Sequence, residues 1–180
     1  DGKLRLIFDT RAPNAHFIEP DPVELSSTDA FANIEVEQPK HDDEDCFLHL
    51  CSGDVECCFY QYALPVAYRH LFGIMPVEAR FLDQSWQQRL NVSGRQLVHC
   101  RVRVVPMGWS WATYIVQRVH LHQLGRLPAC LPWIVDKMKA VNFGPNDGGK
   151  ALYIDNFVCL ATDAELAKEQ VDGMQSALAH

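Results

Sequence analysis

The sequence lacks the long apolar runs that would place it in a membrane. Its uninterrupted apolar stretches fall far short of the 18 or more residues that a membrane-spanning helix needs. It also lacks an initial Met and a charged-then-apolar leader, so we expect no signal peptide and no secretion, and we expect a segment of a longer protein. Charged residues make up only 22% and no internal repeat is visible, which excludes a coiled coil and a disordered chain.

Cysteine occurs in an odd number and without the paired spacing of a zinc finger. The seven cysteines lie mostly inside apolar runs, as buried thiols do, which favours a reducing compartment such as the cytoplasm or the nucleus. Cys46, His49 and Cys51 are close in sequence, but no second pair follows at finger-like spacing. His120 and His122 are two residues apart and point to different sides of a helix. We expect both sets to be core or surface residues.

Positive charge is scarce overall, but the deficit is local. The net charge is −7, and residues 19–45 alone hold ten acids against one base, Lys40. The remainder holds 13 acids and 15 bases, a net charge of +2. The composition therefore does not exclude a nucleic-acid partner, and we interpret residues 19–45 as a solvated acidic surface insertion.

Hydrophobic patterning predicts several strands. Residues 3–8, 47–51 and 97–105 have apolar or alternating patterns, and the second of these is expected to be buried. The third alternates so that Arg101 and Arg103 lie on an outer, cationic face. Residues 151–161 form two apolar runs split by Asp155-Asn156, which predicts a hairpin that turns at these two residues.

Two helices are predicted in the second half of the chain. The first begins at an N-cap, Ser110, and stops at Gly125, with an apolar stripe formed by Ala112, Ile115, Val116 and Val119. The second follows a capping box of Thr162 and Glu165, with a stripe formed by Ala167, Val171, Met174 and Leu178. Residues 12–45 are expected to form a long irregular connection. The mixture of strands, helices and a hairpin indicates a single domain of the α+β class.

Two carboxylates occupy strand ends that could lie side by side. Asp54 ends one apolar strand and Asp155 lies at the tip of the hairpin. Either residue alone is typical of a turn. Together, on neighbouring strands, they would form a hard, oxygen-rich site of the kind that Mg²⁺ prefers. Residues 144–150 have the spacing of a phosphate-binding loop, but Ala151 lacks the required hydroxyl and a strand follows, so we reject that interpretation.

Four stretches, in order, resemble the motifs of reverse transcriptases of the retrotransposon and retrovirus type. Residues 3–14 resemble the fingers strand Lys-x-Arg-x-x-x-Asp-x-Arg-x-x-Asn, and residues 54–61 resemble the first catalytic motif, an Asp followed five residues later by an aromatic. Residues 105–112 resemble the Leu-Pro-Gln-Gly motif, and residues 153–156 resemble the Tyr-x-Asp-Asp box. The resemblance implies an α+β polymerase palm, an antiparallel sheet backed by helices, with part of the fingers and without a thumb or an RNase H domain.

The resemblance also implies a catalytic set. Asp54 and Asp155 would hold two Mg²⁺ ions, or Mn²⁺, and Asn156 stands where the family has its second box Asp. An Asn can coordinate through its carbonyl oxygen but brings no charge. Two-metal nucleotidyl transfer uses such an arrangement. Tyr153 would lie near the primer end.

Further residues would bind the nucleotide and the template, again by resemblance. Lys3 and Arg5 would clamp the triphosphate, a role that suits a planar, permanently charged guanidinium. Phe59 would pack against the sugar and select deoxynucleotides, and a core side chain is the alternative interpretation of this residue. The nascent base pair would lie over Met107 and Gly108. Template phosphates would contact Arg101 and Arg103, for which a solvated strand face is nearly as good an interpretation.

The activity implied is RNA-directed DNA synthesis on an RNA or DNA template with a primer and dNTPs, from a retroelement polyprotein and with no membrane partner. Asn156, Cys57 and Met107 depart from the family's usual residues. These departures keep an alternative open, a catalytically inactive relic or a domesticated scaffold that binds nucleic acid or protein. Since the thumb would be missing, we expect the isolated 180 residues to be weak or inactive.

Overall fold

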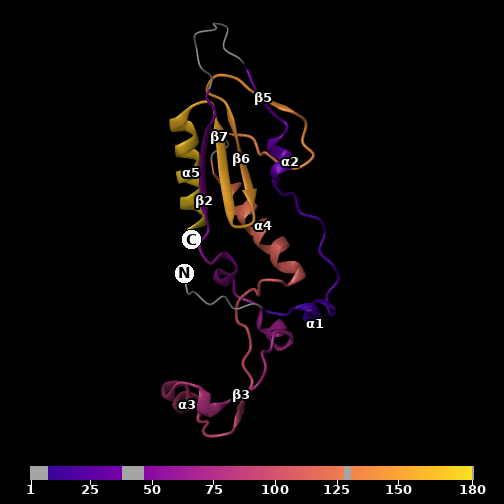
Figure 1. The fold of residues 1–180 in the computed structure, drawn as a ribbon, viewed down its shortest axis with the longest axis vertical. Helices are drawn as coiled ribbons and strands as arrows, with labels where there is room; N and C mark the ends of the chain where they lie inside the picture. Colours follow the sequence, from indigo (N-terminus) through magenta and orange to yellow (C-terminus); the bar gives the residue numbers. More distant parts are fainter. Residues whose placement is uncertain (1–7, 38–46, 128–130, 180) are drawn as a thin grey trace. The chain divides into compact units, whose positions relative to one another are not determined.

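The computed structural model describes residues 8–37, 47–127 and 131–179. The chain divides into two compact units, one formed by Asp1–Glu19 and Phe59–Ala112 and the other by Pro20–Cys58 and Thr113–His180. Helices are combined with small antiparallel and parallel sheets, so the predicted α+β class is confirmed (Figure 1). None of the helices in the described ranges has the length and apolar character needed to cross a membrane.

A three-stranded antiparallel sheet is the centre of the second unit. Its strands are β2 (His49–Asp54), β7 (Asn156–Ala161) and β6 (Gly148–Tyr153), in the order β2-β7-β6. Helix α5 (Ala164–Leu178) lies along β2 and β7 (Figure 1). As predicted, α5 buries the stripe formed by Ala167, Val171, Met174 and Leu178.

The remaining elements of this unit extend its core. Helix α2 (Thr28–Phe31) and strand β1 (Ile34–Val36) come from the segment predicted to be irregular, and β1 pairs in parallel with β5 (Val141–Phe143). Ala30 of α2 is fully buried in a core cluster with Ile134, Phe143, Ala151 and Leu160. The irregular interpretation is therefore wrong for these residues, because a short apolar stretch within the acidic segment packs into the core.

Short elements and a cluster of rings form the first unit. The elements are α1 (Arg11–Asn14), η2 (Val66–Leu71), β3 (Val77–Glu78), η3 (Ala79–Phe81), α3 (Gln84–Leu90) and β4 (Leu97–Val98), while η1 (Cys58–Gln61) begins at the boundary between the units. Strands β3 and β4 pair antiparallel. The rings of Phe17, Tyr68, Phe72 and Trp109 form the cluster, with the Phe17 and Trp109 centroids 5.1 Å apart.

Two of the predicted strands differ from the observed ones. Residues 97–105 form a regular strand only over β4, followed by isolated bridges at Arg101 and Val104, because the chain that they face contains the 3₁₀ helix η2. The predicted alternation persists, with Val102 buried and Arg101 exposed. The strand predicted at 47–51 begins at His49 and is not buried, since within the described ranges β2 pairs with β7 alone and Leu50 is 63% exposed. The strand predicted at 3–8 lies outside the described residues, apart from Phe8.

Helix α4 (Ser110–Leu124) matches the prediction in its end but not in its cap or buried face. Its last turn closes where the Gly125 N–H donates to the Leu121 carbonyl at 2.9 Å, so the predicted stop is confirmed. Ser110 is the first helical residue and not the N-cap. The fully buried positions of α4 are Ala112, Val116, Gln117, His120 and Leu124. The buried face is thus rotated from the predicted one, because two polar side chains belong to it.

The cap of α5 also differs from the prediction. The Asp163 carboxylate accepts a hydrogen bond from the Leu166 N–H at 2.8 Å, which makes Asp163 the N-cap. Thr162 instead donates to the Gly144 and Asp147 carbonyls. The capping box of Thr162 and Glu165 is therefore wrong by one residue, because the Thr162 hydroxyl is taken up by the loop before β6.

Candidate functional site

The two predicted carboxylates lie at the same end of the three-stranded sheet. Asp54 is the last residue of β2, and its register partner on β7 is Asn156. Partners in an antiparallel pair have Cα atoms roughly 4.5–5.5 Å apart. Asp155 directly precedes Asn156, and its carbonyl accepts a hydrogen bond from the Val55 N–H at 2.9 Å. The pairing of β2 with β7 therefore brings Asp54, Asp155 and Asn156 together.

The hairpin that carries Asp155 turns one residue earlier than predicted. Tyr153 pairs with Asn156, so Ile154 and Asp155 form the two-residue loop between β6 and β7. Ile154 has a φ of 59°, in the left-handed region that is costly for a β-branched residue. The predicted turn at Asp155-Asn156 is wrong because Asn156 takes part in the pairing with both neighbours.

The side chain of Asn156 contacts the side chain of Asp155 directly. Its Nδ2 donates a hydrogen bond to Asp155 Oδ1 at 2.8 Å. Asn156 thus engages one oxygen of the neighbouring carboxylate through its amide, where an Asp would place a second negative charge. Tyr153, expected near the primer end, is exposed on the same turn.

Two buried polar side chains of α4 hold the turn. The Ile154 N–H donates to Gln117 Oε1 at 2.8 Å, and His120 Nδ1 lies 2.7 Å from the Ile154 carbonyl oxygen. Gln117 also donates to the Leu152 carbonyl at 3.1 Å. Sequence reasoning missed Gln117 and treated His120 as an ordinary core or surface residue. No local signal in the sequence marks the pair, since the burial of the amide and the imidazole is a property of the folded chain.

Cys58 lies beneath the same turn. Its Sγ is 4.0 Å from His120 Nε2. Burial, and then the negative charges of Asp155 and Asp54, raise the pKa of the Cys58 thiol to about 12. Burial also lowers the pKa of His120, although its hydrogen bond to Ile154 and the Asp155 charge oppose the shift. Both groups are therefore neutral near pH 7, and both carboxylates act on the same thiol.

This donor set fits a divalent cation that keeps part of its coordination for other ligands. The turn offers two carboxylates and the amide of Asn156, and Mg²⁺ typically takes one or two carboxylates and completes its shell with water and substrate phosphates. Over the described ranges, no group of three or more His, Cys, Asp or Glu side chains is placed to hold a metal ion. A closed structural metal site is thus not what these residues form.

A second turn, in the first unit, contains the predicted nucleotide-binding residues Met107 and Gly108. Gly108 has a φ of 97°, a conformation that side chains disfavour. Its carbonyl accepts hydrogen bonds from Thr10 Oγ1 at 2.6 Å and from Asn14 Nδ2 at 3.1 Å. The Ser110 N–H donates to Asn14 Oδ1 at 3.0 Å. Asn14 therefore caps the first turn of α4 and fixes the Gly108 turn at the same time.

The other predicted site residues of the first unit are placed as follows. Phe59 lies in η1 and is half-buried. This burial is compatible with a ring that contacts a sugar and with a ring that belongs to the core. Arg101, Arg103 and Met107 are exposed. Lys3 and Arg5 lie outside the described residues.

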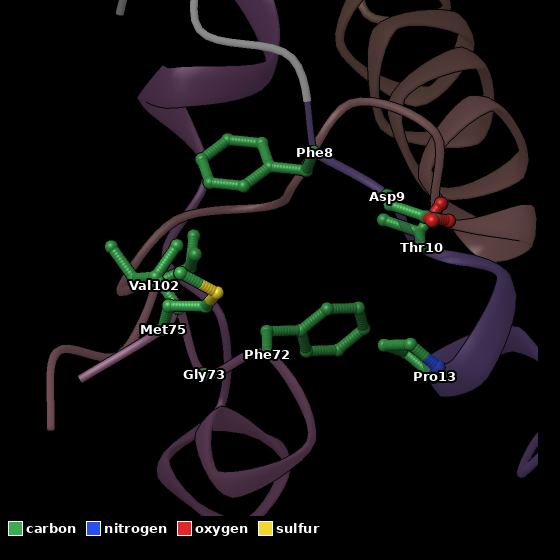
Figure 2. A pocket seen from close by; sticks show the side chains of 9 residues that line it. Phe8, Asp9, Thr10, Pro13, Phe72, Gly73, Met75 and Val102 are labelled. Carbon is green, nitrogen blue, oxygen red and sulfur yellow. The ribbon is translucent and has the colours of Figure 1, made fainter.

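The first unit also contains a cavity of about 210 Å³, shown in Figure 2. Phe8 and Phe72 lie on opposite sides of it, and Met75 and Val102 line a third side (Figure 2). Among the lining residues that the structure describes, the charged one is Asp9, whose pKa is lowered to about 2 by its hydrogen bonds and ion pair with Arg11, 2.6 Å away.

Comparison with known proteins adds no relative. No protein-family model matches the chain, and no curated protein matches its sequence at a significant level.

Proposed function

We propose that this chain is a polymerase palm with part of the fingers, and that it carries out template-directed nucleotidyl transfer of dNTPs. The observation that carries the proposal is that two residues to which the resemblance assigns metal binding lie next to each other in the fold. Asp54 and Asp155 belong to motifs that are 101 residues apart in sequence, and the β2–β7 pairing makes them neighbours. Chance matches to two short motifs give no reason to expect that adjacency.

The proposed roles follow from the chemistry of each side chain. Asp54 and Asp155 would hold the divalent cations, which, when bound, supply the charge neutralisation that in-line transfer at a phosphorus requires. Asn156 would orient the Asp155 carboxylate through its hydrogen bond. Tyr153, exposed beside the turn, would contact the primer end. These residues would leave the remaining coordination positions to a triphosphate and a primer hydroxyl.

The resemblance assigns nucleotide and template contacts to residues that belong to the first unit. Met107 and Gly108 would support the nascent base pair, and Phe59 would pack against the sugar. Lys3 and Arg5 would bind the triphosphate, while Arg101 and Arg103 would bind template phosphates. The resemblance further suggests an intracellular retroelement polyprotein in which a thumb and an RNase H domain accompany this segment.

A non-catalytic scaffold is the second candidate. It is favoured by Asn156, which replaces a family carboxylate with a neutral amide that is already engaged by Asp155. A scaffold would bind a primer–template without any requirement for Asp54. The two candidates therefore differ in what substitution of that residue does.

Single-nucleotide addition tests the proposal most simply, because it does not require processive grip. An excess of the 180-residue chain is mixed with an RNA template, a labelled DNA primer, the matching dNTP and Mg²⁺ or Mn²⁺. We expect slow addition of one nucleotide by the wild type, and a decrease of more than about 100-fold in Asp54→Asn and Asp155→Asn. Asp172→Asn, which neutralises an exposed acid on α5, is the matched control and should retain the wild-type rate.

Two results would decide against catalysis. Wild-type protein that binds the primer–template and adds no nucleotide with either metal would favour the scaffold. Addition that continues unchanged in both Asp variants would show that another site, or a contaminant, is responsible.

A further inference from the structure

The loop residue next to Asp155 is held in an unfavourable conformation. The left-handed region is unfavourable for any non-glycine residue, and a β-branched residue is among the worst suited to it. Ile154 has this conformation at φ 59°. Such strain persists only where the surroundings over-determine it. The question is which groups do so here.

Both backbone polar groups of Ile154 are bound by side chains of α4. Gln117 Oε1 accepts from its N–H at 2.8 Å, and His120 Nδ1 donates to its carbonyl at 2.7 Å, since a carbonyl oxygen only accepts. Gln117 extends this grip to the preceding strand by donating to the Leu152 carbonyl. Gln117 thus holds the peptide before Ile154 by its N–H, and His120 holds the peptide that leads into Asp155 by its carbonyl.

Gln117 and His120 are polar side chains that are almost completely buried. Gln117 and His120 are each only 1% exposed. Hydrogen bonds in such dry surroundings are strong, and a buried amide is costly unless it is paired. Gln117 is well paired, since it also donates to the Glu24 carbonyl at 3.0 Å. An apolar residue at either position could be buried without the free-energy cost of removing a polar group from water. The presence of two polar residues there therefore needs an explanation.

We propose that Gln117 and His120 are positioning residues that hold the Ile154 backbone so that the Asp155 carboxylate meets Asp54 around a divalent cation. They touch the turn and not the cation, so they act through Asp155. The inference deepens the proposed function and rests on it, because it takes Asp54 and Asp155 as the cation ligands.

Mn²⁺ binding, followed by electron paramagnetic resonance of the free ion, tests this without any need for catalysis. Residues that orient metal ligands typically change metal affinity by about 10–100-fold. We expect this loss in Gln117→Leu and in His120→Leu. The matched controls on the same helix are Gln123→Leu and His122→Leu, which should bind Mn²⁺ as the wild type does. Hydrogen exchange at the Ile154 amide should accelerate in the first pair and not in the second.

A pair of polar variants separates positioning from general packing, and it keeps the test valid if a leucine variant fails to fold. The amide nitrogen of Asn at position 120 can occupy the place of His120 Nδ1 and donate to Ile154. The amide nitrogen of Gln reaches instead toward the place of Nε2, near Cys58. We therefore expect His120→Asn to retain Mn²⁺ affinity within about threefold and His120→Gln to lose about tenfold or more.

The outcomes distinguish this inference from the proposed function. Equal Mn²⁺ affinities in wild type, Gln117→Leu and His120→Gln would overturn the positioning role even if the protein extends primers. If those variants bind Mn²⁺ more weakly than the wild type does, and the wild type adds no nucleotide, the positioning role is supported and the polymerase proposal is overturned. A wild type that binds Mn²⁺ no better than Asp54→Asn would overturn both.

Discussion

Two turns, one in each unit, carry candidate site residues and reach positive φ by different means. In the first unit Gly108 has a φ of 97°, which glycine adopts without steric cost. In the second unit Ile154 has a φ of 59°, and buried hydrogen bonds from Gln117 and His120 hold it there. The first turn relies on the residue itself and the second on its surroundings. A turn of the first kind can be recognised from sequence, whereas a turn of the second kind cannot.

Gly108→Ala should have the largest effect of the substitutions that test this comparison. A Cβ there would meet Thr10 Oγ1 at 2.9 Å and would also force a side chain into a disfavoured conformation. We expect a loss of about 2 kcal/mol or more in the free energy of unfolding, measured by denaturant titration. Gly94→Ala is the control, since Gly94 also has a positive φ but has open space around it, and it should cost about 1 kcal/mol. Equal losses would remove the steric part of the argument.

Removal of the Asn14 side chain should have the next largest effect, because Asn14 links the Gly108 turn to the first turn of α4. Asn14→Ala loses a bond to the Gly108 carbonyl and the cap at Ser110, which should destabilise the protein by about 1–2 kcal/mol in a thermal or denaturant melt. Asn14→Asp keeps the acceptor for the Ser110 N–H but replaces the donor to the Gly108 carbonyl with a second acceptor, so it should lose stability for that bond alone. An Ala variant as stable as the wild type would show that neither bond contributes.

Ile154→Gly should change stability by less than about 1 kcal/mol in either direction. Glycine would relieve the left-handed strain but would lose more chain entropy on folding, and these terms are of similar size. The side-chain bonds to the backbone at position 154 would remain. A loss above about 2 kcal/mol, measured in the same titration as for Gly108→Ala, would show that the isoleucine side chain and not the hydrogen bonds supports this turn.

The smallest effect concerns the buried thiol under the second turn. Burial raises the pKa of Cys58 to about 12, so the protein should keep this thiol protonated at pH 8 and inert towards iodoacetamide. Its neighbour Cys57 is exposed and should be labelled first, as peptide mass spectrometry can measure. Rapid alkylation of Cys58 in the folded protein would contradict a dry environment beneath Asp155.

Much of the second unit could be predicted from the sequence because its signals are local. The stripe of α5 and the stop at Gly125 follow from periodicity and from one residue type. The strand pattern offers the adjacency of Asp54 and Asp155 only as one possibility, and the resemblance makes it an expectation, since no local pattern encodes which strands pair. The edge position of β2, which exposes Leu50, is likewise a property of the whole sheet.

The misplaced details share one physical cause, which is a partner distant in sequence. Asn14 caps α4 from 96 residues away, and Gln117 holds a turn 37 residues later in the chain. The predicted buried face of α4 contains only apolar residues, so it does not indicate that two polar positions of this helix bind a turn. Local capping rules favour Ser110 and Thr162 for the same reason, because they do not include the competing hydrogen bonds of the folded chain.

The most direct test of the central claim asks whether Asp54 and Asp155 act as one cation site. Mn²⁺ affinity would be measured for the wild type, Asp54→Asn, Asp155→Asn and the double variant. A shared site predicts that each single variant loses most of the binding and that the double variant loses little more, since both act on the same ion. Losses that simply add, or single variants that bind Mn²⁺ as the wild type does, would contradict the account.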